Sequence, residues 1–503
     1  MPSAGVRLRR AWRRIGEQGA WLRIVAVVAI IAVVGGAVVG IVAVAGSGGG
    51  SGEGTGTSHP IRTLKDVPAS TDGVSDKSVT VVFPVIDLSA AGSAAGLTDI
   101  TDEKDPAGIT AYVREINDRG GVHGRKIDAR IVKFNPLKPA EMRALCKDWT
   151  TSGEVFAVVD TGKWYGDNQL CITEEGHLPL ISSWTTVTDW TDRGAPFLWW
   201  TGPDQAAILR NLVPWAIDHG LLSNDKKFAI LAGDRAGDDL AVNKYLLPAL
   251  KAKGLKPTLV DTITTNLDDP ATAASQAKSA VTRLKSENVQ TVIPLLSVYP
   301  PFQSYLSAAK AQDYKPALVL SDYEATVSTA LGLAEFNYPD ELSGQIGPTV
   351  YTLSNEDDDR PDGMTKLSGP GYTPEAKACW KTWSEHHTKP PYIESQGPTM
   401  RWCDAVHVLA KALDLAGRNL NRRTFIEALG KIKDFPVALT QAITFGPDDH
   451  SGPATYRTVR PVKNGDTPAT NKCPPRRPTP DDDNPLHGSC WQLVEDWKPL
   501  QTG

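Results

Sequence analysis

The segment NDRGGVHGRKI, residues 117–127, decides how the chain is interpreted, because three glycines followed by two cations can form either a phosphate-binding loop or a plain turn. A phosphate-binding loop needs a strand before it and a helix after it, so that backbone amides and the helix N-terminus point at the anion. Here an amphipathic helical pattern comes first, and the alternating segment KIDARIVKF follows. Lys126 is also followed by Ile127 instead of Ser or Thr. We therefore predict a structural turn from a helix into a strand, with glycine supplying left-handed backbone.

Length and composition indicate a globular chain with more than one core. The chain has 503 residues, of which 41% are hydrophobic and 22% are charged, and both values are close to globular averages. Because single cores stop growing well below this length, we predict two packed lobes with appendages. The formal net charge is -5. The first 46 residues are rich in arginine, so the rest of the chain is acidic and offers no general footprint for nucleic acid.

The N-terminal region contains an apolar run, residues 24–45, that carries no charge and is long enough to cross a bilayer as a helix. The basic segment before it, residues 1–23, favours a cytoplasmic N-terminus and a single-pass anchor in the cell membrane. A cleaved signal peptide is the alternative, because Ala43 and Ala45 form an A-x-A pattern at the end of the run. Both interpretations place the body outside the cytoplasm, either anchored or secreted. Residues 46–77 are a flexible linker rich in Gly and Ser.

All six cysteines follow the apolar run, and an even count in an exported chain favours disulfides. No CxxC motif or Cys/His cluster with the spacing of a metal site is present, so we predict no metal. Six cysteines allow fifteen connectivities. Sequence order suggests the pairs Cys146–Cys171, Cys379–Cys403 and Cys473–Cys490.

The rest of the chain alternates strand-like and helix-like patterns in two successive series, which predicts an α/β fold with two parallel sheets, each covered by helices on both faces. The first series spans residues 78–203 and the second spans 204–343. Residues 344–460 then contribute three helices. The end of the chain, residues 461–503, is rich in proline and acidic residues, so we expect it to lie against the body as a tail closed by a disulfide.

Five segments together make the chain similar to a known family. They are EINDRGGVHGRKI, AASQAKSAVTRLKSENVQTVIPL, WCDAVHVLAKALDLAG, NRRTFIEAL and ITFGPDDHSGPATYRTVR. The region from residue 78 to about residue 460 resembles the type 1 periplasmic binding proteins, specifically the branched-chain amino acid (Leu/Ile/Val) receptors of ABC importers. The resemblance implies two Rossmann-like lobes joined by a hinge. Lobe 1 would comprise 78–203 and the return segment 344–460, lobe 2 would comprise 204–343, and the solute would bind between them.

Ligands of open α/β sheets bind beyond the carboxyl ends of the strands, which selects a small set of loops in this sequence. The resemblance implies that hydroxyls and backbone amides of lobe 1 bind a carboxylate while an acid of lobe 2 binds an ammonium. The predicted ligand-binding residues are Asp87, Ser89, Thr161, Gly162, Trp164, Ser182, Ser183, Trp184, Thr185, Asp234, Tyr299, Asp322 and Glu324. Ala236 stands before Gly237 where the family usually has an aromatic residue, and tryptophans stand where it often has small polar residues. We therefore expect a solute larger than a branched-chain amino acid, or an aromatic one.

These observations predict a solute-binding receptor of an ABC importer for a small amino-acid-like, amide or aromatic solute. No G-x-S-x-G or H-E-x-x-H motif is present, so we expect no enzymatic activity and no cofactor. The expected partners are the solute, an ABC-transporter permease and the membrane. A membrane-anchored sensor or a cell-envelope interaction protein with the same fold is the alternative. A sensor normally needs a cytoplasmic output domain, and the basic segment before the apolar run is short, which favours the receptor.

Overall fold

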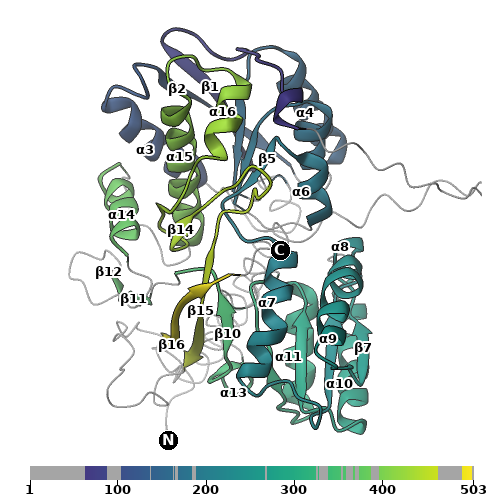
Figure 1. Cartoon of the computed structure of the whole chain (residues 1–503). Helices are drawn as coiled ribbons and strands as arrows, with labels where there is room; N and C mark the ends of the chain where they lie inside the picture. Colours follow the sequence, from purple (N-terminus) through teal and green to yellow (C-terminus); the bar gives the residue numbers. More distant parts are fainter. Residues whose placement is uncertain are drawn as a thin grey trace, which may run out of the picture.

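The computed structural model describes residues 63–87, 104–135, 138–161, 164, 168–183, 188–266, 269–323, 327, 338–352, 355–357, 366–368, 373–386, 396–462 and 490–500. The basic segment 1–23, the apolar run 24–45 and residues 46–62 of the predicted linker lie outside these residues. The prediction of a flexible linker up to residue 77 is wrong, because residues 64–66 form a helical turn and Val67 is buried in the core of lobe 1. Among the helices of the described part, none combines the length and the apolar character that a bilayer crossing requires. Figure 1 shows two lobes stacked one above the other, with several chain segments running between them.

Lobe 1 is built on a five-stranded parallel sheet with the strand order β2-β1-β3-β4-β5. Its strands are β1 (Ser78–Ile86), β2 (Lys126–Phe134), β3 (Ala157–Asp160), β4 (Leu180–Ser182) and β5 (Leu198–Trp200). Its helical segments are η1 (Leu64–Asp66), α3 (Lys104–Asp118), α4 (Pro139–Thr151), α5 (Asn168–Leu170), η2 (Cys171–Glu175), α6 (Thr188–Gly194), α14 (Pro374–His386), α15 (Gln396–Ala416) and α16 (Arg422–Leu429). The alternation of helices and strands predicted for residues 78–203 is confirmed.

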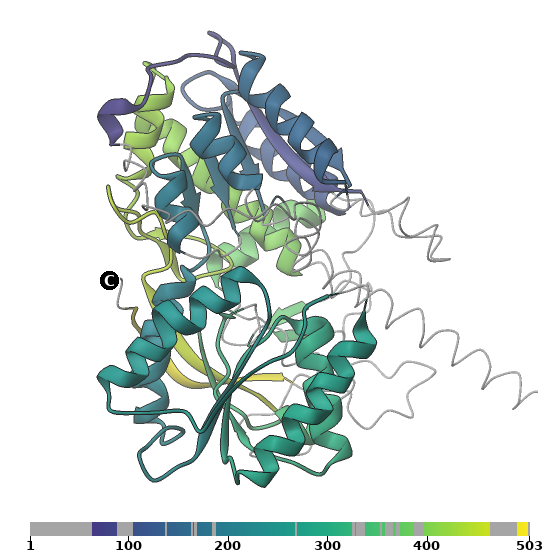
Figure 2. The same ribbon diagram turned by 90° about the vertical axis from the view of Figure 1, so that its right-hand side faces the viewer.

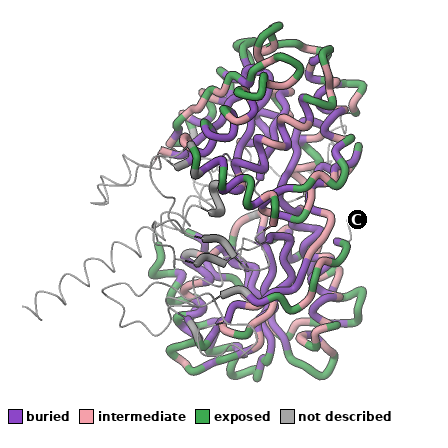
Figure 3. The backbone as a smooth tube through the Cα atoms, turned by 90° about the vertical axis from the view of Figure 1, so that its left-hand side faces the viewer, coloured by how far each residue is buried: buried purple, intermediate pink, exposed green. Residues whose placement is uncertain are grey.

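Side-chain alternation along β1 explains why helices cover both faces of this sheet. Val81, Phe83 and Val85 belong to the apolar core that α3, α15 and α16 share, whereas Val82 and Ile86 belong to the core beneath α4. A strand that is apolar on both faces must be covered on both. Figure 3 shows the consequence, since the buried backbone runs through the middle of each lobe and the exposed backbone surrounds it.

The glycine-rich segment of residues 117–127 is a turn from α3 into β2, as predicted. Gly120, Gly121 and Gly124 all have positive φ. Val122 and Arg125 exchange two backbone hydrogen bonds, with N···O distances of 2.8 and 3.0 Å. A Cβ on Gly121 would lie 2.0 Å from the carbonyl oxygen of Arg125, so any side chain at this position requires the turn to shift. The turn connects to the amino end of β2, at the opposite edge of the sheet from the predicted ligand loops.

Lobe 2 repeats the architecture with a four-stranded parallel sheet in the order β7-β6-β8-β9. Figure 2 shows its helices on both sides of that sheet. The strands are β6 (Phe228–Ala232), β7 (Leu259–Thr262), β8 (Thr291–Leu295) and β9 (Ala317–Leu318). The helical segments are α7 (Gln205–Asp218), α8 (Ala236–Leu240), η3 (Ala241–Leu246), α9 (Leu247–Ala252), α10 (Pro270–Ser286), η4 (Val298–Phe302), α11 (Gln303–Ala311) and α13 (Pro339–Leu342).

The C-terminal third of the chain builds the connection between the lobes. It contains a three-stranded antiparallel sheet of β10 (Gly347–Thr349), β15 (Thr455–Val462) and β16 (Cys490–Pro499). Two short hairpins complete it, formed by β11 (Asn355–Asp357) with β12 (Lys366–Ser368) and by β13 (Phe435–Pro436) with β14 (Ala442–Ile443).

The lobe boundary at residue 460 differs from the expected one. We expected residues 344–460 to return to lobe 1, but from Thr455 the chain runs along lobe 2 as β15. Val459 packs into the core of lobe 2, and Trp215 of α7 donates its indole N–H to Thr458 at 2.9 Å. The chain thus crosses between the lobes a third time. The crossing lets β15 bury Val459 in the core of lobe 2. The last described residues, which we expected in a disulfide-closed tail lying against the body, pair with it as β16.

Two of the three suggested disulfides are confirmed. Cys146 is bonded to Cys171 and Cys379 is bonded to Cys403. The suggested partner of Cys490, Cys473, lies outside the described residues. Each confirmed bridge joins two helical segments within lobe 1.

Candidate functional site

Two buried hydroxyl groups lie side by side at the carboxyl edge of the lobe 1 sheet. Thr161 follows β3 and Ser183 follows β4, and these strands are neighbours with Asp160 opposite Ser182. Both side chains are only 2% exposed. Neither Thr161 Oγ1 nor Ser183 Oγ has a hydrogen-bond partner among the described residues. Because a buried hydroxyl without a partner costs free energy, these two oxygens are candidates for binding a ligand group.

Asp160 holds this edge together, although it was not among the predicted site residues. It is fully buried, and its backbone carbonyl accepts the N–H of Ser183 at 3.1 Å. Its Oδ1 accepts the N–H of Trp164 at 3.1 Å, and its Oδ2 accepts the hydroxyl of Ser182 at 3.2 Å. The hydroxyl of Ser182 is therefore engaged with Asp160, whereas the hydroxyl of Ser183 remains for a ligand. An aspartate as the last residue of a strand, directly before Thr-Gly, is the sequence signal that could have identified it.

Trp164 is part of the packing beneath the loop, which differs from its predicted contact with the ligand. Its ring packs against Phe134 and Trp149, with centroid distances of 4.9 and 4.7 Å. The side chain has no exposed surface, and its indole N–H donates to the carbonyl of Asn168 at 3.1 Å. Trp164 is therefore a core residue, because its ring is packed against two other aromatic rings and its indole N–H already has an acceptor.

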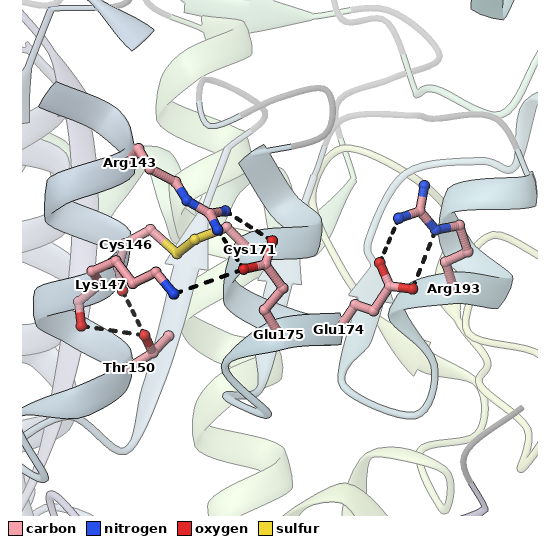
Figure 4. Close-up of polar contacts among 8 residues, drawn as sticks. All are labelled: Arg143, Cys146, Lys147, Thr150, Cys171, Glu174, Glu175 and Arg193. Atoms are coloured by element: carbon pink, nitrogen blue, oxygen red, sulfur yellow. Dashed lines mark hydrogen bonds and ion pairs between the residues drawn. A yellow bond between two sulfur atoms is a disulfide. The ribbon is translucent and has the colours of Figure 1, made fainter. Parts of the chain in front are cut away.

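Figure 4 shows how the segment that follows this loop is anchored. The disulfide joins Cys146 of α4 to Cys171 of η2. Arg143 donates to both carboxylate oxygens of Glu175 at 2.8 and 2.5 Å, which lowers the pKa of that carboxyl. Arg193 of α6 donates to both oxygens of Glu174 at 3.3 and 2.6 Å. One covalent bond and two bidentate ion pairs thus fix the chain on the C-terminal side of the site loop.

The lobe 2 acid selected from the sequence, Asp322, lies at the hinge. It follows β9 and is 3% exposed, and its Oδ2 accepts the N–H of Val350, directly after β10, at 2.7 Å. Its Oδ1 is buried without a partner among the described residues. Burial raises the pKa of Asp322 to about 7, although hydrogen bonds from Val350 and Thr349 act in the opposite direction. The residue can therefore bind a hydrogen-bond donor with one oxygen while the other holds the hinge.

Asp234, also predicted from the sequence, closes a loop instead. It is exposed, and its Oδ1 accepts both the N–H and the hydroxyl of Thr265, at 2.9 and 2.7 Å. Partial burial opposes its ionisation, but these hydrogen bonds outweigh that effect and the pKa is lowered. Asp234 is thus an ionised cap that ties the end of β6 to the loop after β7.

The neighbouring residues of the same loop form a tight polar cluster. Arg235 donates to both oxygens of Asp238 at 2.8 and 2.9 Å, and the hydroxyl of Tyr323 donates to the same carboxylate at 2.6 Å. A Cβ on Gly233 would lie 2.2 Å from Asp238 Oδ2. This cluster borders a pocket of about 270 Å³, whose lining includes Asp234 and Asn243. The pocket opens at the carboxyl ends of β6 and β7, where the fold rule places ligands.

The remaining predicted residues are only partly placed. Asp87 follows β1, is half-buried, and donates its backbone N–H to Phe134 at 2.8 Å. Tyr299 lies in η4, but its side chain is outside the described part. The other predicted residues, Ser89, Gly162, Trp184, Thr185 and Glu324, lie outside the described residues.

The lobes touch beside the site. Asp189 of α6 in lobe 1 accepts hydrogen bonds from Lys244 and Tyr245 of η3 in lobe 2, with the tyrosine hydroxyl at 3.1 Å. The bond to Asp189 raises the pKa of Lys244. Together with the three crossings of the chain, this contact brings the carboxyl edges of both sheets to the same region between the lobes (Figure 1).

Comparisons with known proteins agree with this geometry. A model of the family described as periplasmic binding protein matches residues 90–466. No curated protein matches the chain. A solute-binding protein of an ABC transporter from Rhodopseudomonas palustris BisB5, in complex with 3,4-dihydroxybenzoic acid, is 13% identical, with a TM-score of 0.57 over 85% of this chain and 99% of that one.

Two further solved structures share the fold. A fatty acid ABC transporter substrate-binding protein from Thermomonospora curvata is 18% identical, with a TM-score of 0.55 over 86% of this chain and 95% of that one. An ABC transporter substrate-binding protein from Desulfitobacterium hafniense in complex with Leu is 15% identical, with a TM-score of 0.52 over 76% of this chain and 97% of that one. The family match spans most of the chain, so the chain belongs to the periplasmic binding protein family and has the extracytoplasmic solute-binding fold of ABC-transporter receptors.

Proposed function

We propose that this chain delivers a small organic carboxylate, either an amino acid or an aromatic acid, to an ABC-transporter permease without altering it chemically. The observation that carries the proposal is the pair of buried, unpartnered hydroxyls of Thr161 and Ser183 on adjacent strands. Two hydroxyl donors at the ends of adjacent strands match the two oxygens of a carboxylate.

Asp322 supplies the second half of the proposed site. Its partnerless Oδ1 can accept a hydrogen bond from an ammonium or hydroxyl group of the solute. The two solved complexes with this fold described above contain Leu and 3,4-dihydroxybenzoic acid, which both combine a carboxylate with a hydrogen-bond donor. Trp164 gives no support to an aromatic preference because its ring is in the core, so the carboxylate is the chemistry on which the proposal rests.

The proposal also includes a membrane anchor. Residues 24–45 would hold the receptor to the membrane, and residues 46–62 of the predicted linker would let the lobes reach the permease, because from η1 onward the chain packs on lobe 1. Washing membranes with alkaline carbonate tests this part, because an anchored receptor stays with the lipid. Release of the intact chain into the wash would contradict an anchor while leaving solute binding untouched.

A thermal-shift screen of amino acids, amides and aromatic acids on the purified chain identifies the solute, and calorimetry then measures its affinity. We expect Thr161→Val and Ser183→Ala each to weaken binding by about tenfold to a hundredfold, because a hydrogen bond to a charged group contributes about 1.5–3 kcal/mol. Thr110→Val is the matched control, since that exposed hydroxyl donates to Pro106 on α3. Unchanged affinity in both site variants would contradict the assigned residues.

A further inference from the structure

A sulfur and nitrogen cluster lies among the helices of lobe 1, in a part of the fold that solute binding does not use. Cys379 of α14 lies against Cys403 and His407 of α15, and the two sulfurs and a ring nitrogen all lie within 4.8 Å of one another. Cys403 and His407 are one helical turn apart on the same face. In the oxidised chain the two sulfurs are bonded to each other.

The histidine ring is oriented from both sides. One ring nitrogen, Nδ1, lies 3.5 Å from the sulfur of Cys403, and the other, Nε2, lies 3.5 Å from Oε2 of Glu115 on α3. Glu115 is itself held by Thr382 at 3.2 Å and by Arg119 at 2.7 Å. A carboxylate that fixes the far nitrogen of a histidine is the usual support of a metal-binding imidazole.

Burial and access also suit a metal ion. Cys379 and Cys403 are 2% and 0% exposed, whereas the side chain of His407 is 29% exposed. The sulfurs would therefore lie in a dry environment, and an ion could reach them past the imidazole ring.

We propose that reduction of the Cys379–Cys403 disulfide creates a binding site for a thiophilic divalent cation such as Zn²⁺. A dithiol reductant supplies two electrons and two protons and is itself oxidised to a disulfide, which leaves two cysteine thiols. The cation then takes both thiolates and Nδ1 of His407, and the two thiol protons are released to solvent. Two thiolates with one imidazole, and a fourth position open to water, form a set that Zn²⁺ prefers. The site thus reports the thiol redox state of the envelope independently of solute binding.

The other disulfide provides the contrast. Cys146 and Cys171 are flanked by Arg143, Lys147 and Glu175, and no group of three possible ligands includes them in the described part of the chain. In the part of the chain that the structure describes, reduction therefore frees two cysteine pairs, and of these the Cys379 and Cys403 pair has a histidine placed to complete a metal site.

The experiment measures binding of Co²⁺ and Zn²⁺ to the full chain before and after reduction with a phosphine. We expect the reduced chain to bind one Co²⁺ with a thiolate charge-transfer band, and the oxidised chain to show no such band. His407→Gln and Glu115→Gln should each weaken Zn²⁺ binding, measured against a chromophoric chelator, by about 10-fold to 100-fold or more. Cys379→Ser with Cys403→Ser should abolish the band. His123→Gln is the matched control. His123 lies in the turn between α3 and β2, away from the cysteines, and its ring contacts the backbone carbonyl of Asp414.

Three outcomes would overturn the proposal. The first is the absence of the charge-transfer band in the reduced chain, including the case in which near-ultraviolet circular dichroism shows that reduction unfolds it. The second is equal Zn²⁺ affinity in wild type and His407→Gln. The third is a band of full intensity in the Cys379→Ser, Cys403→Ser variant, which would assign the metal to freed thiols in general.

Discussion

Asp322 gives the sharpest test of the site, because its burial makes the stability of the chain depend on pH. The pKa of this carboxyl is about 7 in the folded chain and about 4 when unfolded. Between these values the folded state keeps the proton and the unfolded state releases it, so each rise of one pH unit lowers the free energy of unfolding by about 1.4 kcal/mol. Below pH 4 and above pH 7 both states carry the same charge, and this contribution stops changing.

Asp322→Asn removes that dependence while keeping an oxygen for the N–H of Val350. Relative to the wild type, we expect the free energy of unfolding of the variant to rise by about 3 kcal/mol between pH 5 and pH 8, and not to rise further above pH 8. Any constant difference between an amide and a protonated acid cancels in this comparison. Urea unfolding at each pH, followed by the fluorescence of the tryptophans, measures the gain.

Asp404 is the control for this experiment. It is buried in lobe 1, accepts the N–H groups of Ala438 and Leu439 at 2.7 and 2.8 Å, and burial also raises its pKa to about 7. Because the two acids lie in different lobes, the effect of Asp322→Asn should persist on an Asp404→Asn background. A difference between wild type and Asp322→Asn that stays constant from pH 5 to pH 8 would refute the assignment of a buried, partly unsatisfied acid at the hinge.

Three further expectations test the surroundings of the site. Replacing Cys146 and Cys171 with serine should lower the free energy of unfolding by about 3 kcal/mol, measured by urea unfolding, because the bridge closes a loop with a sequence separation of 25; a loss below about 1 kcal/mol would contradict this. Gly121→Ala should cost about 1–3 kcal/mol and leave solute affinity unchanged, whereas Gly120→Ala, with no atom within 4 Å of its Cβ, should cost less. Tyr323→Phe should lower the free energy of unfolding by about 2 kcal/mol, because the lost hydroxyl donates to the buried carboxylate of Asp238 in lobe 2. Equal unfolding midpoints of the variant and the wild type would show that water replaces this hydrogen bond.

The sequence predicted the parts of the fold that local patterns encode. Alternating periods identified both parallel sheets, and the order of helix, glycines and strand identified the turn at Gly121. Thr161, Ser183 and Asp322 were selected because the ends of parallel strands meet at one edge of a sheet and hydroxyls or acids at that edge are few. The structure buries all three, and their part in binding a ligand stays a prediction. Each of these inferences uses residues close together in the chain.

The missed features depend on contacts between residues far apart. Trp164 was assigned to the ligand because its loop is near the cleft, but its ring is covered by Trp149 and Phe134, which no local pattern reveals. The third crossing of the chain was missed because β15 alternates like a surface strand and becomes a lobe 2 strand only through Thr458 and Val459. The burial of a side chain and the choice of its hydrogen-bond partner depend on tertiary structure. They can therefore differ from the role that the position of a residue in the sequence suggests.

In the proposed site, the position of Asp322 would also link solute binding to lobe closure. One of its oxygens accepts the backbone N–H of Val350, directly after β10, and the other would accept a donor of the solute. A solute group that donates to the second oxygen favours the ionised carboxylate, and an ionised carboxylate holds Val350 more strongly. The same charge therefore stabilises both contacts, so solute binding and hinge geometry favour each other without any further device. A solute that carries no donor for Asp322 should consequently bind lobe 1 and fail to stabilise the closed arrangement, because it has no differential affinity for it.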